Sequence, residues 1–338
     1  MSTVLPRVVL VAMTLLMLTA CASSPAAPAV KEGQRDPNAA VTLGLSFDIL
    51  NNIRQAEKAA IEAKAKQLGA TVVFTVADGD AQRQAAQIQD LLKQRVSAII
   101  AIAQDKQAIV GAIKQANAAG VPFLTLDREV APGGTVALHV GADPYSDGRV
   151  AAQYMAYTAA AKGRDLKVLV LVGDLADANA VERNRGFKEE IAHWPNITIV
   201  NEAPTEWKPE QAEAATEQAL QAHPDLNAVF CPSDYLLPSV LSSLQAADKL
   251  AAADDQQHIM IVSIDGDPFG YSKTADKVIS ADVATLVDVM GARVTERAVE
   301  AARGQALPSN KEIVPGLLFS YHNASAVAAN VWGAQIRR

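Results

Sequence analysis

Acids and amides recur at one kind of position in this chain, directly after short apolar runs. Asp127 and Arg128 follow the run VPFLTL, and Asp265 follows IMIVSI. In open α/β sheets, ligands bind beyond the carboxyl ends of the strands, so these positions are the first candidates for a binding site. Carboxylates accept hydrogen bonds, and amides both donate and accept them, which suits a ring of hydroxyl groups better than a phosphate. The strand-end residues of this kind are Phe47-Asp48, Asn51-Asn52, Asp78, Gln104-Asp105, Asp127-Arg128, Gly173-Asp174, Ser233-Asp234 and Asp265-Gly266.

A polar side chain at the end of a strand can instead cap the helix that follows it. We expect capping for Asp78 or Asp80 and for Asp105, because a helical pattern begins soon after each of them. Asp127 differs, because the turn sequence VAPGG and another strand follow it. No helix needs its carboxylate, and we therefore predict that Asp127 binds a ligand.

The elements that position these residues alternate between strand and helix. Apolar runs such as TVVFTV and KVLVLV predict strands buried on both faces, and the segments between them carry apolar residues at helical spacing. About ten strand-helix units predict two parallel sheets of five or six strands, because one open sheet rarely holds so many. The predicted strands are 41–46, 71–76, 98–102, 121–126, 136–140, 167–172, 197–200, 228–230, 259–264 and 278–283, and the predicted helices are 51–68, 81–94, 106–119, 145–161, 179–193, 209–222, 237–247 and 286–303.

The first forty residues have the pattern of an export and anchoring signal. Arg7 precedes an apolar run, 8–18, that is too short to cross a bilayer. The run ends in Leu18-Thr19-Ala20-Cys21, which resembles the lipobox of bacterial lipoproteins and implies cleavage before a lipid-bearing Cys21. We expect a signal peptide at 1–20 and a lipidated Pro/Ala/Ser tether at 21–40, so that the protein is extracytoplasmic and anchored to the cell membrane. The alternative is a plain secretory leader with a chance cysteine.

Composition and motif content exclude several classes of protein. The net charge of −7 and the lack of a basic stripe argue against a nucleic-acid partner. We find no G-x-S-x-G, P-loop, H-E-x-x-H or C-x-x-C motif, and the five histidines have no ligand spacing, so we expect no enzyme, no cofactor and no metal site. His139 is expected to be a satisfied core residue, and Cys231, at the end of an apolar strand, to be buried and inert.

Several short motifs, in a fixed order along the chain, resemble those of the periplasmic binding proteins for ribose and xylose. The resemblance covers residues 41–319, and the segment VPGLL at 314–318 resembles the xylose branch. The matching segments are Ser46 with Asn51-Asn52, Val121-Pro122 with Leu126-Asp127-Arg128, Gly141-Ala142-Asp143, Asn179 with Arg183 and Gly186-Phe187, Ala228-Val229-Phe230 with Ser233-Asp234, and Ile264-Asp265-Gly266.

The resemblance implies an α/β fold of two Rossmann-like lobes with parallel sheets, joined by three hinge crossings, which is the type I periplasmic binding protein fold. The lobes of such proteins close on a sugar by a hinge motion and present the closed form to an ABC permease. The crossings are expected near 142–143, 285–286 and 315–318, the N-terminal lobe at 41–142 plus 286–315, and the C-terminal lobe at 143–285 plus 316–338.

The resemblance also assigns roles to single residues. Asp127 and Asp265 match acids that hold sugar hydroxyls, and Arg128 matches an arginine that donates to them. Asn179, Trp207 and Arg54 match a ligand asparagine, a stacking tryptophan and a ligand arginine of the xylose branch. Ile53-Arg54 stand where ribose-binding proteins have two phenylalanines, and Ser233 where they have an asparagine, which argues against ribose. Arg183 either replaces a ribose-type arginine or braces Glu182. The full expected set is Phe47, Asp48, Arg54, Asp127, Arg128, Asn179, Arg183, Trp207, Ser233, Asp234, Asp265 and Thr285.

Together these features predict the substrate-binding lipoprotein of an ABC sugar importer, a monomer that captures a xylose-like pentose or hexose. Its partners would be the sugar, the permease and, through Cys21, the membrane. A sensor subunit that presents a sugar or autoinducer-like ligand to a receptor is the alternative, because it would use the same cleft. A transcription regulator of this fold would need a helix-turn-helix ahead of the first strand, and leader and tether occupy that position.

Overall fold

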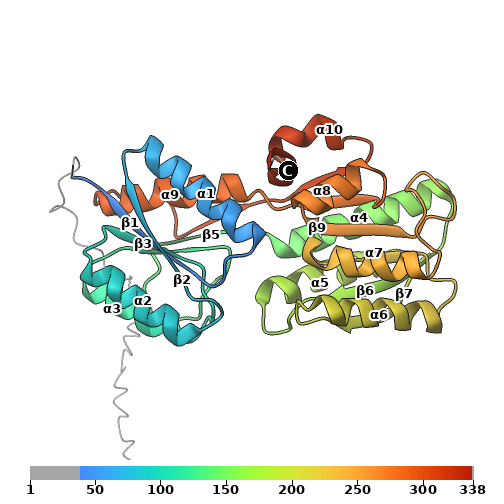
Figure 1. Ribbon diagram of the computed structural model, residues 1–338, viewed down its shortest axis with the longest axis horizontal. Coiled ribbons are helices and arrows are strands. Elements are labelled where there is room, and N and C mark those ends of the chain that lie inside the picture. The colour runs from blue at the N-terminus through green and yellow to red at the C-terminus, as the bar shows by residue number, and fades with distance from the viewer. Residues whose placement is uncertain (1–38, 337–338) are drawn as a thin grey trace, which may run out of the picture.

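The computed structural model describes residues 39–336, which form two α/β lobes lying side by side (Figure 1). Each lobe is built on one sheet of six strands. The predicted signal peptide, Cys21 and nearly all of the predicted tether lie outside the described residues. Between residues 39 and 336, no helix has both the length and the apolar character needed to cross a membrane.

The sheet of the first lobe is parallel throughout, with strand order β11-β5-β4-β3-β1-β2. Successive residues of a strand point to opposite faces, so Ile100 packs toward α1 and α9 while Ile99 packs toward α2 and α3. Burial on both faces explains the continuous apolar runs. The elements of this lobe are β1 (Thr42–Phe47), α1 (Asn52–Gln67), β2 (Thr71–Val76), α2 (Ala81–Lys93), β3 (Ala98–Ala101), α3 (Val110–Ala118), β4 (Phe123–Leu126), β5 (Leu138–Ala142), α9 (Val287–Ala302) and β11 (Lys311–Val314).

The sheet of the second lobe has strand order β12-β10-β9-β8-β6-β7, and only β12 runs antiparallel to its neighbour. One face packs against α4 and α5, and the other against α6 and α7. The elements are α4 (Pro144–Lys162), β6 (Leu166–Val172), α5 (Ala178–Ile191), β7 (Ile197–Pro204), α6 (Pro209–Ala222), β8 (Ala228–Phe230), η1 (Asp234–Leu236), α7 (Leu237–Ala246), β9 (Met260–Asp265), α8 (Pro268–Ala275), β10 (Ala281–Ala284), β12 (Leu317–Ser320), α10 (Ala324–Val327), η2 (Ala328–Asn330) and α11 (Trp332–Gln335).

The chain passes between the lobes three times, as the fold class requires. The links are Asp143 between β5 and α4, residues 285–286 between β10 and α9, and residues 315–316 between β11 and β12. All the predicted strands and helices are present, with ends shifted by a few residues. The prediction of two parallel sheets of five or six strands is therefore confirmed, with β12 as the one antiparallel strand.

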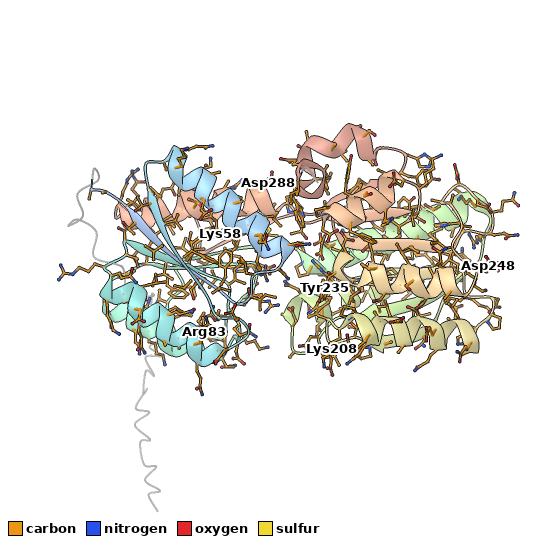
Figure 2. All side chains as sticks on the ribbon, viewed as in Figure 1. Lys58, Arg83, Lys208, Tyr235, Asp248 and Asp288 are labelled. Atoms are coloured by element: carbon orange, nitrogen blue, oxygen red, sulfur yellow. The ribbon has the colours of Figure 1, made fainter. Side chains whose placement is uncertain are left out.

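Some acids that follow strands of the first lobe bond the backbone of the next segment, and others do not. Asp80 rather than Asp78 caps α2, because its side chain accepts from the backbone N–H groups of Gln82 and Arg83. Asp78 instead pairs with the Arg83 side chain at 2.8 Å on the surface, where Figure 2 labels Arg83. Asp105 accepts from the backbone N–H groups of Gln107 and Ala108 in the turn before α3, so it holds that turn and does not cap the helix itself, whose first turn has no side-chain cap.

Two further residues behave as the sequence predicts. His139 is buried, and a ring nitrogen shares a hydrogen bond of 2.9 Å with the Thr125 hydroxyl. Cys231 is fully buried at the end of β8, and this burial raises the pKa of its thiol, so the reactive thiolate is disfavoured.

Candidate ligand-binding site

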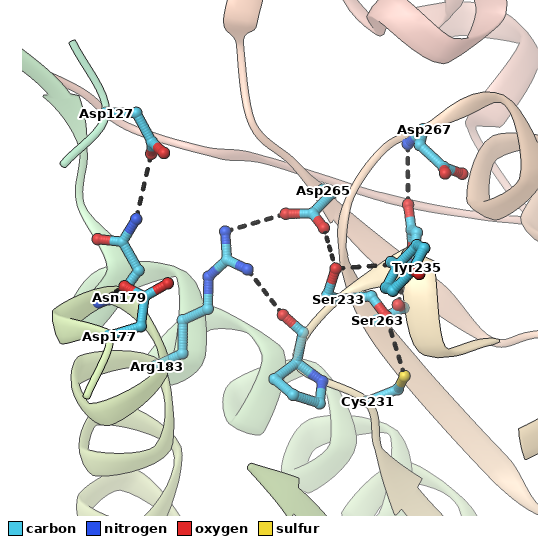
Figure 3. Close-up of polar contacts among 12 residues, drawn as sticks. Asp127, Asp177, Asn179, Arg183, Cys231, Ser233, Tyr235, Ser263, Asp265 and Asp267 are labelled. Carbon is cyan, nitrogen blue, oxygen red and sulfur yellow. Dashed lines mark hydrogen bonds and ion pairs between the residues drawn. The ribbon is translucent and has the colours of Figure 1, made fainter. Parts of the chain in front are cut away.

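Asp127 comes directly after β4, with its backbone in the left-handed region at φ 60°. An aspartate tolerates this conformation better than most residues, but it remains uncommon outside glycine. One carboxylate oxygen accepts from Arg54 Nη2 at 2.7 Å, and the other accepts from Asn179 Nδ2 of the second lobe at 3.1 Å. The predicted acid therefore lies where the two lobes meet, as Figure 3 shows for Asp127 and Asn179.

Arg54 is the centre of the charge network beneath Asp127. Asn51 caps α1 and places Arg54 in its first turn, where the residue is 4% exposed. Nε donates to Asp48 at 3.1 Å, Nη1 to Glu57 at 2.9 Å, and Nη2 to Asp127. All three nitrogens thus bond carboxylates of the first lobe. The structure therefore uses Arg54 to hold these acids in place, behind the position expected for a ligand.

Burial and charge in this network shift the pKa values of Asp127 and Glu57 in opposite directions. Burial alone would raise the pKa of Asp127, but the guanidinium groups of Arg54 and Arg128 outweigh it and lower that pKa to about 2. Burial raises the pKa of Glu57 to about 7, even though Arg54 opposes the shift. Asp127 is accordingly a permanent carboxylate at neutral pH, whereas Glu57 is poised between its two forms.

Arg128 makes the second contact between the lobes. Nη1 pairs with Asp48 at 3.1 Å in its own lobe, and Nη2 pairs with Asp177 of the second lobe at 3.4 Å. Asp177 also caps α5 and accepts from the Trp207 indole N–H at 3.2 Å. Asp177 was not among the predicted site residues. It lies five positions beyond the end of β6. The one sequence signal that could have identified it as a site residue is an acid placed directly ahead of a helix.

Asp265 occupies the equivalent position in the second lobe, as the last residue of β9. Its carboxylate accepts from Arg183 Nη2 at 3.0 Å and from the Ser233 hydroxyl at 2.5 Å (Figure 3). Burial raises the pKa of Asp265, although Arg183 and Ser233 both oppose the shift. Arg183 is itself buried, and its other contact is the Pro232 carbonyl at 2.7 Å.

Two predicted site residues have other roles. Phe47 is fully buried in the core of the first lobe, edge-on to Phe74, so the prediction that it lines the ligand site is corrected. Asp234 uses both carboxylate oxygens inside the second lobe, on the Ser263 hydroxyl and the Asp267 backbone N–H. The alternative that Arg183 braces Glu182 is also wrong.

Glu182 pairs with Arg185 instead, on the exposed side of α5. The sequence could not separate these two arginines, because they are two positions apart. The helical period turns Arg183 inward to the site and Arg185 outward to water.

The remaining predicted residues stand at the junction of the lobes. The Trp207 ring is half-buried and lies against Gly173, where an added Cβ would come within 2.2 Å of the indole. Thr285 lies in one crossing, and its buried hydroxyl has no hydrogen-bond partner within residues 39–336. The Nε–H groups of Arg128 and Arg183 also lack a partner in the described part of the chain. Buried polar groups are nearly always hydrogen-bonded, so these three donors are available to a polar partner at the junction.

These features define a two-lobed α/β solute-binding protein, with an acid and an arginine from each lobe at the junction. The chain belongs to the periplasmic binding protein family, whose domain model matches residues 44–306. It is 30% identical over 301 residues to the ribose import binding protein of Bacillus subtilis, covering 88% of this chain and 93% of that protein. It is 27% identical over 252 residues to a D-apiose import binding protein of Paraburkholderia graminis, covering 75% and 76% of the two chains.

The fold agrees with a solved structure of the same class. An ABC transporter solute-binding protein from Mycobacterium smegmatis with bound glycerol superposes with a TM-score of 0.76 at 25% identity, covering 86% of this chain and 97% of the other. No group of three or more His, Cys, Asp or Glu side chains between residues 39 and 336 is arranged to hold a metal ion.

Proposed function

We propose that this chain is the substrate-binding lipoprotein of an ABC importer and that it captures a neutral monosaccharide between its lobes. The observation that carries the proposal is that each lobe brings one aspartate to the junction, and each aspartate bonds a buried arginine of its own lobe. These are Asp127 with Arg54 and Asp265 with Arg183. Curated relatives over most of the chain are import binding proteins for ribose and apiose. In this proposal the sugar contacts both lobes, and the lobes close around it by a hinge motion at the three crossings.

The donors and acceptors at the junction suit hydroxyl groups. Each acid can accept from sugar hydroxyls, while the unpartnered Nε–H groups of Arg128 and Arg183 can donate to them. Arg54, Arg128 and Arg183 are each paired with an acid, so none of them is left as the counter-charge of an anionic ligand. The Trp207 ring offers an apolar face for the C–H side of a sugar ring.

We further propose a xylose-like pentose or a hexose as the ligand. Ile53 and Arg54 occupy the place of the two phenylalanines of ribose-binding proteins, and Arg54 is committed to three carboxylates. Lobes of 41–142 plus 286–315 and 143–285 plus 316–338 would move as rigid bodies about the crossings. We also propose that the protein is monomeric and extracytoplasmic, the second because it belongs to the periplasmic binding protein family.

A thermal-shift screen of monosaccharides tests the function. We expect at least one pentose or hexose to raise the melting temperature, since a ligand at 100 times its Kd stabilises by about 2.7 kcal/mol, which corresponds to a rise on the order of 5 °C. Small-angle scattering with that sugar should show a smaller radius of gyration. A panel in which amino acids or sugar acids stabilise the protein and no neutral sugar does would refute the proposal.

Lipidation at Cys21 is the second expectation of the proposal. In cells fed labelled palmitate, we expect the wild-type protein to carry label and Cys21→Ser to carry none and to leave the membrane fraction. Cys231→Ser is the matched control, because Cys231 is fully buried and should not change labelling. A wild-type protein without label would show that the leader is a plain secretory signal, and label retained in Cys21→Ser would place the lipid on another residue.

A further inference from the structure

The backbone of Asp265 has a conformation that requires support. Its φ of 127° lies in a region that residues with a side chain rarely adopt, and Gly266 follows at φ 66°. Such a conformation persists only where the surrounding structure holds it. Because Asp265 is the acid that the second lobe brings to the ligand site, whatever holds this turn also sets the direction of the carboxylate.

The support comes from the far end of the chain. The Asp265 carbonyl accepts from the Trp332 indole N–H at 2.8 Å, across 67 positions in the sequence, and from the Thr285 backbone N–H at 3.0 Å. The next carbonyl, of Gly266, accepts from the Gly333 backbone N–H at 3.1 Å. Trp332 is 3% exposed, so the bond is shielded from water. The first turn of α11 is thus bonded to both residues of the Asp265-Gly266 turn.

Packing fixes this C-terminal segment, residues 324–335, beside the hinge. Ala324 and Val331 form an apolar cluster with Ala284 and Phe319, and Leu286 and Leu317 pack against it. Ala284, Leu286 and Leu317 flank two of the three crossings between the lobes. Figure 1 shows the segment, in red, lying over α8 on the second lobe. A Cβ at Gly333 would come within 2.3 Å of the Asp267 backbone, so the segment approaches the turn as closely as glycine allows.

We propose that Trp332 is a positioning residue of the ligand site, which holds the Asp265 carbonyl and so directs the Asp265 carboxylate toward the ligand. Arg183 and Ser233 fix the two carboxylate oxygens, and Trp332 fixes the backbone from which they project. No Trp332 atom needs to touch the ligand. The inference deepens the proposed function and rests on it where the test measures affinity for a sugar.

The test compares two variants that each remove one hydrogen bond of the C-terminal segment. Trp332→Phe keeps an aromatic ring in the cluster and loses the bond to Asp265. Tyr271→Phe is the matched control, because the Tyr271 hydroxyl bonds the Ala324 carbonyl at 3.3 Å and does not touch Asp265. We expect Trp332→Phe to weaken sugar binding by roughly three- to tenfold, as the loss of one neutral hydrogen bond predicts. Tyr271→Phe should leave the affinity within twofold of wild type.

A second measurement needs no ligand. In protein labelled with ¹³C at the aspartate carboxyl carbons, the Asp265 resonance is assigned by its loss in Asp265→Asn. We expect this resonance to move in Trp332→Phe and to stay in Tyr271→Phe. In the wild-type protein, the Trp332 indole N–H should exchange slowly with solvent, a measurement that holds even if a variant fails to fold.

The outcomes separate the inference from the proposed function. An unmoved resonance in Trp332→Phe, a rapidly exchanging indole N–H, or unchanged affinity despite a moved resonance would each overturn the inference. If the wild-type protein binds no monosaccharide while the resonance moves only in Trp332→Phe, the proposed function fails, and Trp332 is still supported as the residue that positions Asp265.

Discussion

Asp127→Ala is expected to weaken sugar binding by about 10²- to 10⁴-fold while the protein stays folded. Each hydrogen bond to a charged group in a dry site contributes about 1.5–3 kcal/mol, and we expect Asp127 to accept two from the ligand. Arg54 keeps Asp48 and Glu57 as partners, so the buried guanidinium is not left without a counter-charge. Isothermal titration with the sugar identified in the screen measures the loss.

The matched control for this prediction is Asp78→Ala. Asp78 also follows a strand of the first lobe and also has a left-handed backbone, but its side chain is on the surface beside Arg83. Its removal should leave affinity unchanged. An Asp127→Ala protein that binds within threefold of wild type would remove Asp127 from the site.

The effect of Asp127→Ala on the free energy of unfolding should depend on pH. The pKa of Asp127 is lowered to about 2 in the folded protein and would be near 3.9 in the unfolded chain. Its carboxylate therefore stabilises the fold fully above about pH 4, and this contribution is lost as the pH falls through about 2. The stability gap between wild type and Asp127→Ala should narrow on acidification over that range.

Arg183→Met is expected to lower the free energy of unfolding by about 3–5 kcal/mol, the usual cost of removing one partner of a buried ion pair. Arg183 is buried and bonds Asp265, and its charge also opposes the raised pKa of Asp147. Without it, two buried carboxylates lose their nearest counter-charge. Denaturant unfolding, followed by circular dichroism, measures the difference.

Arg185→Met, two positions further along α5, is the matched control and should change stability little. Arg185 makes ion pairs with Glu182 and Glu189, but these are on the surface, where such pairs contribute little. The large loss should also depend on pH. Burial raises the pKa of Asp147 to about 7, so ionising it costs stability as the pH rises from about 4 to 7, and the loss of Arg183 increases that cost. Equal losses in the two variants, or a loss in Arg183→Met that does not grow with pH, would contradict the assigned role.

Most of the fold could be predicted because buried parallel strands leave an unambiguous sequence pattern. KVLVLV has no polar face, and its apolar run gives β6 almost to the residue. The elements that were missed are short or lie at edges. β11, with sequence KEIV, has mixed polarity because it is an edge strand, and α8 has only eight residues, too few to show a helical period. α8 does begin with an Asp267 cap and a proline, which are signals of a helix start. The prediction followed the apolar spacing instead, which is absent here.

The site residues also fall into those that the sequence could predict and those that it could not. Asp127 and Asp265 could be predicted because the ends of parallel strands have a defined place in the fold. What the pattern could not supply is the direction of each side chain. Phe47 ends a strand and points into the core, and Arg54 faces three carboxylates. Asp177 and Trp332 reach the site through partners far away in the sequence, and spacing along the chain carries no record of them.

The order in which the lobes are completed has a consequence for synthesis. The first lobe needs α9, whose Met290, Val294 and Ala298 fill its core, and its sheet ends in β11 at residues 311–314. A ribosome that has made the first five strands has therefore made five of the six strands of that sheet, and α9 is still missing beside α1 on one face. Because the last pieces of both lobes lie near the end of the chain, neither lobe can be completed until nearly the whole chain has been made.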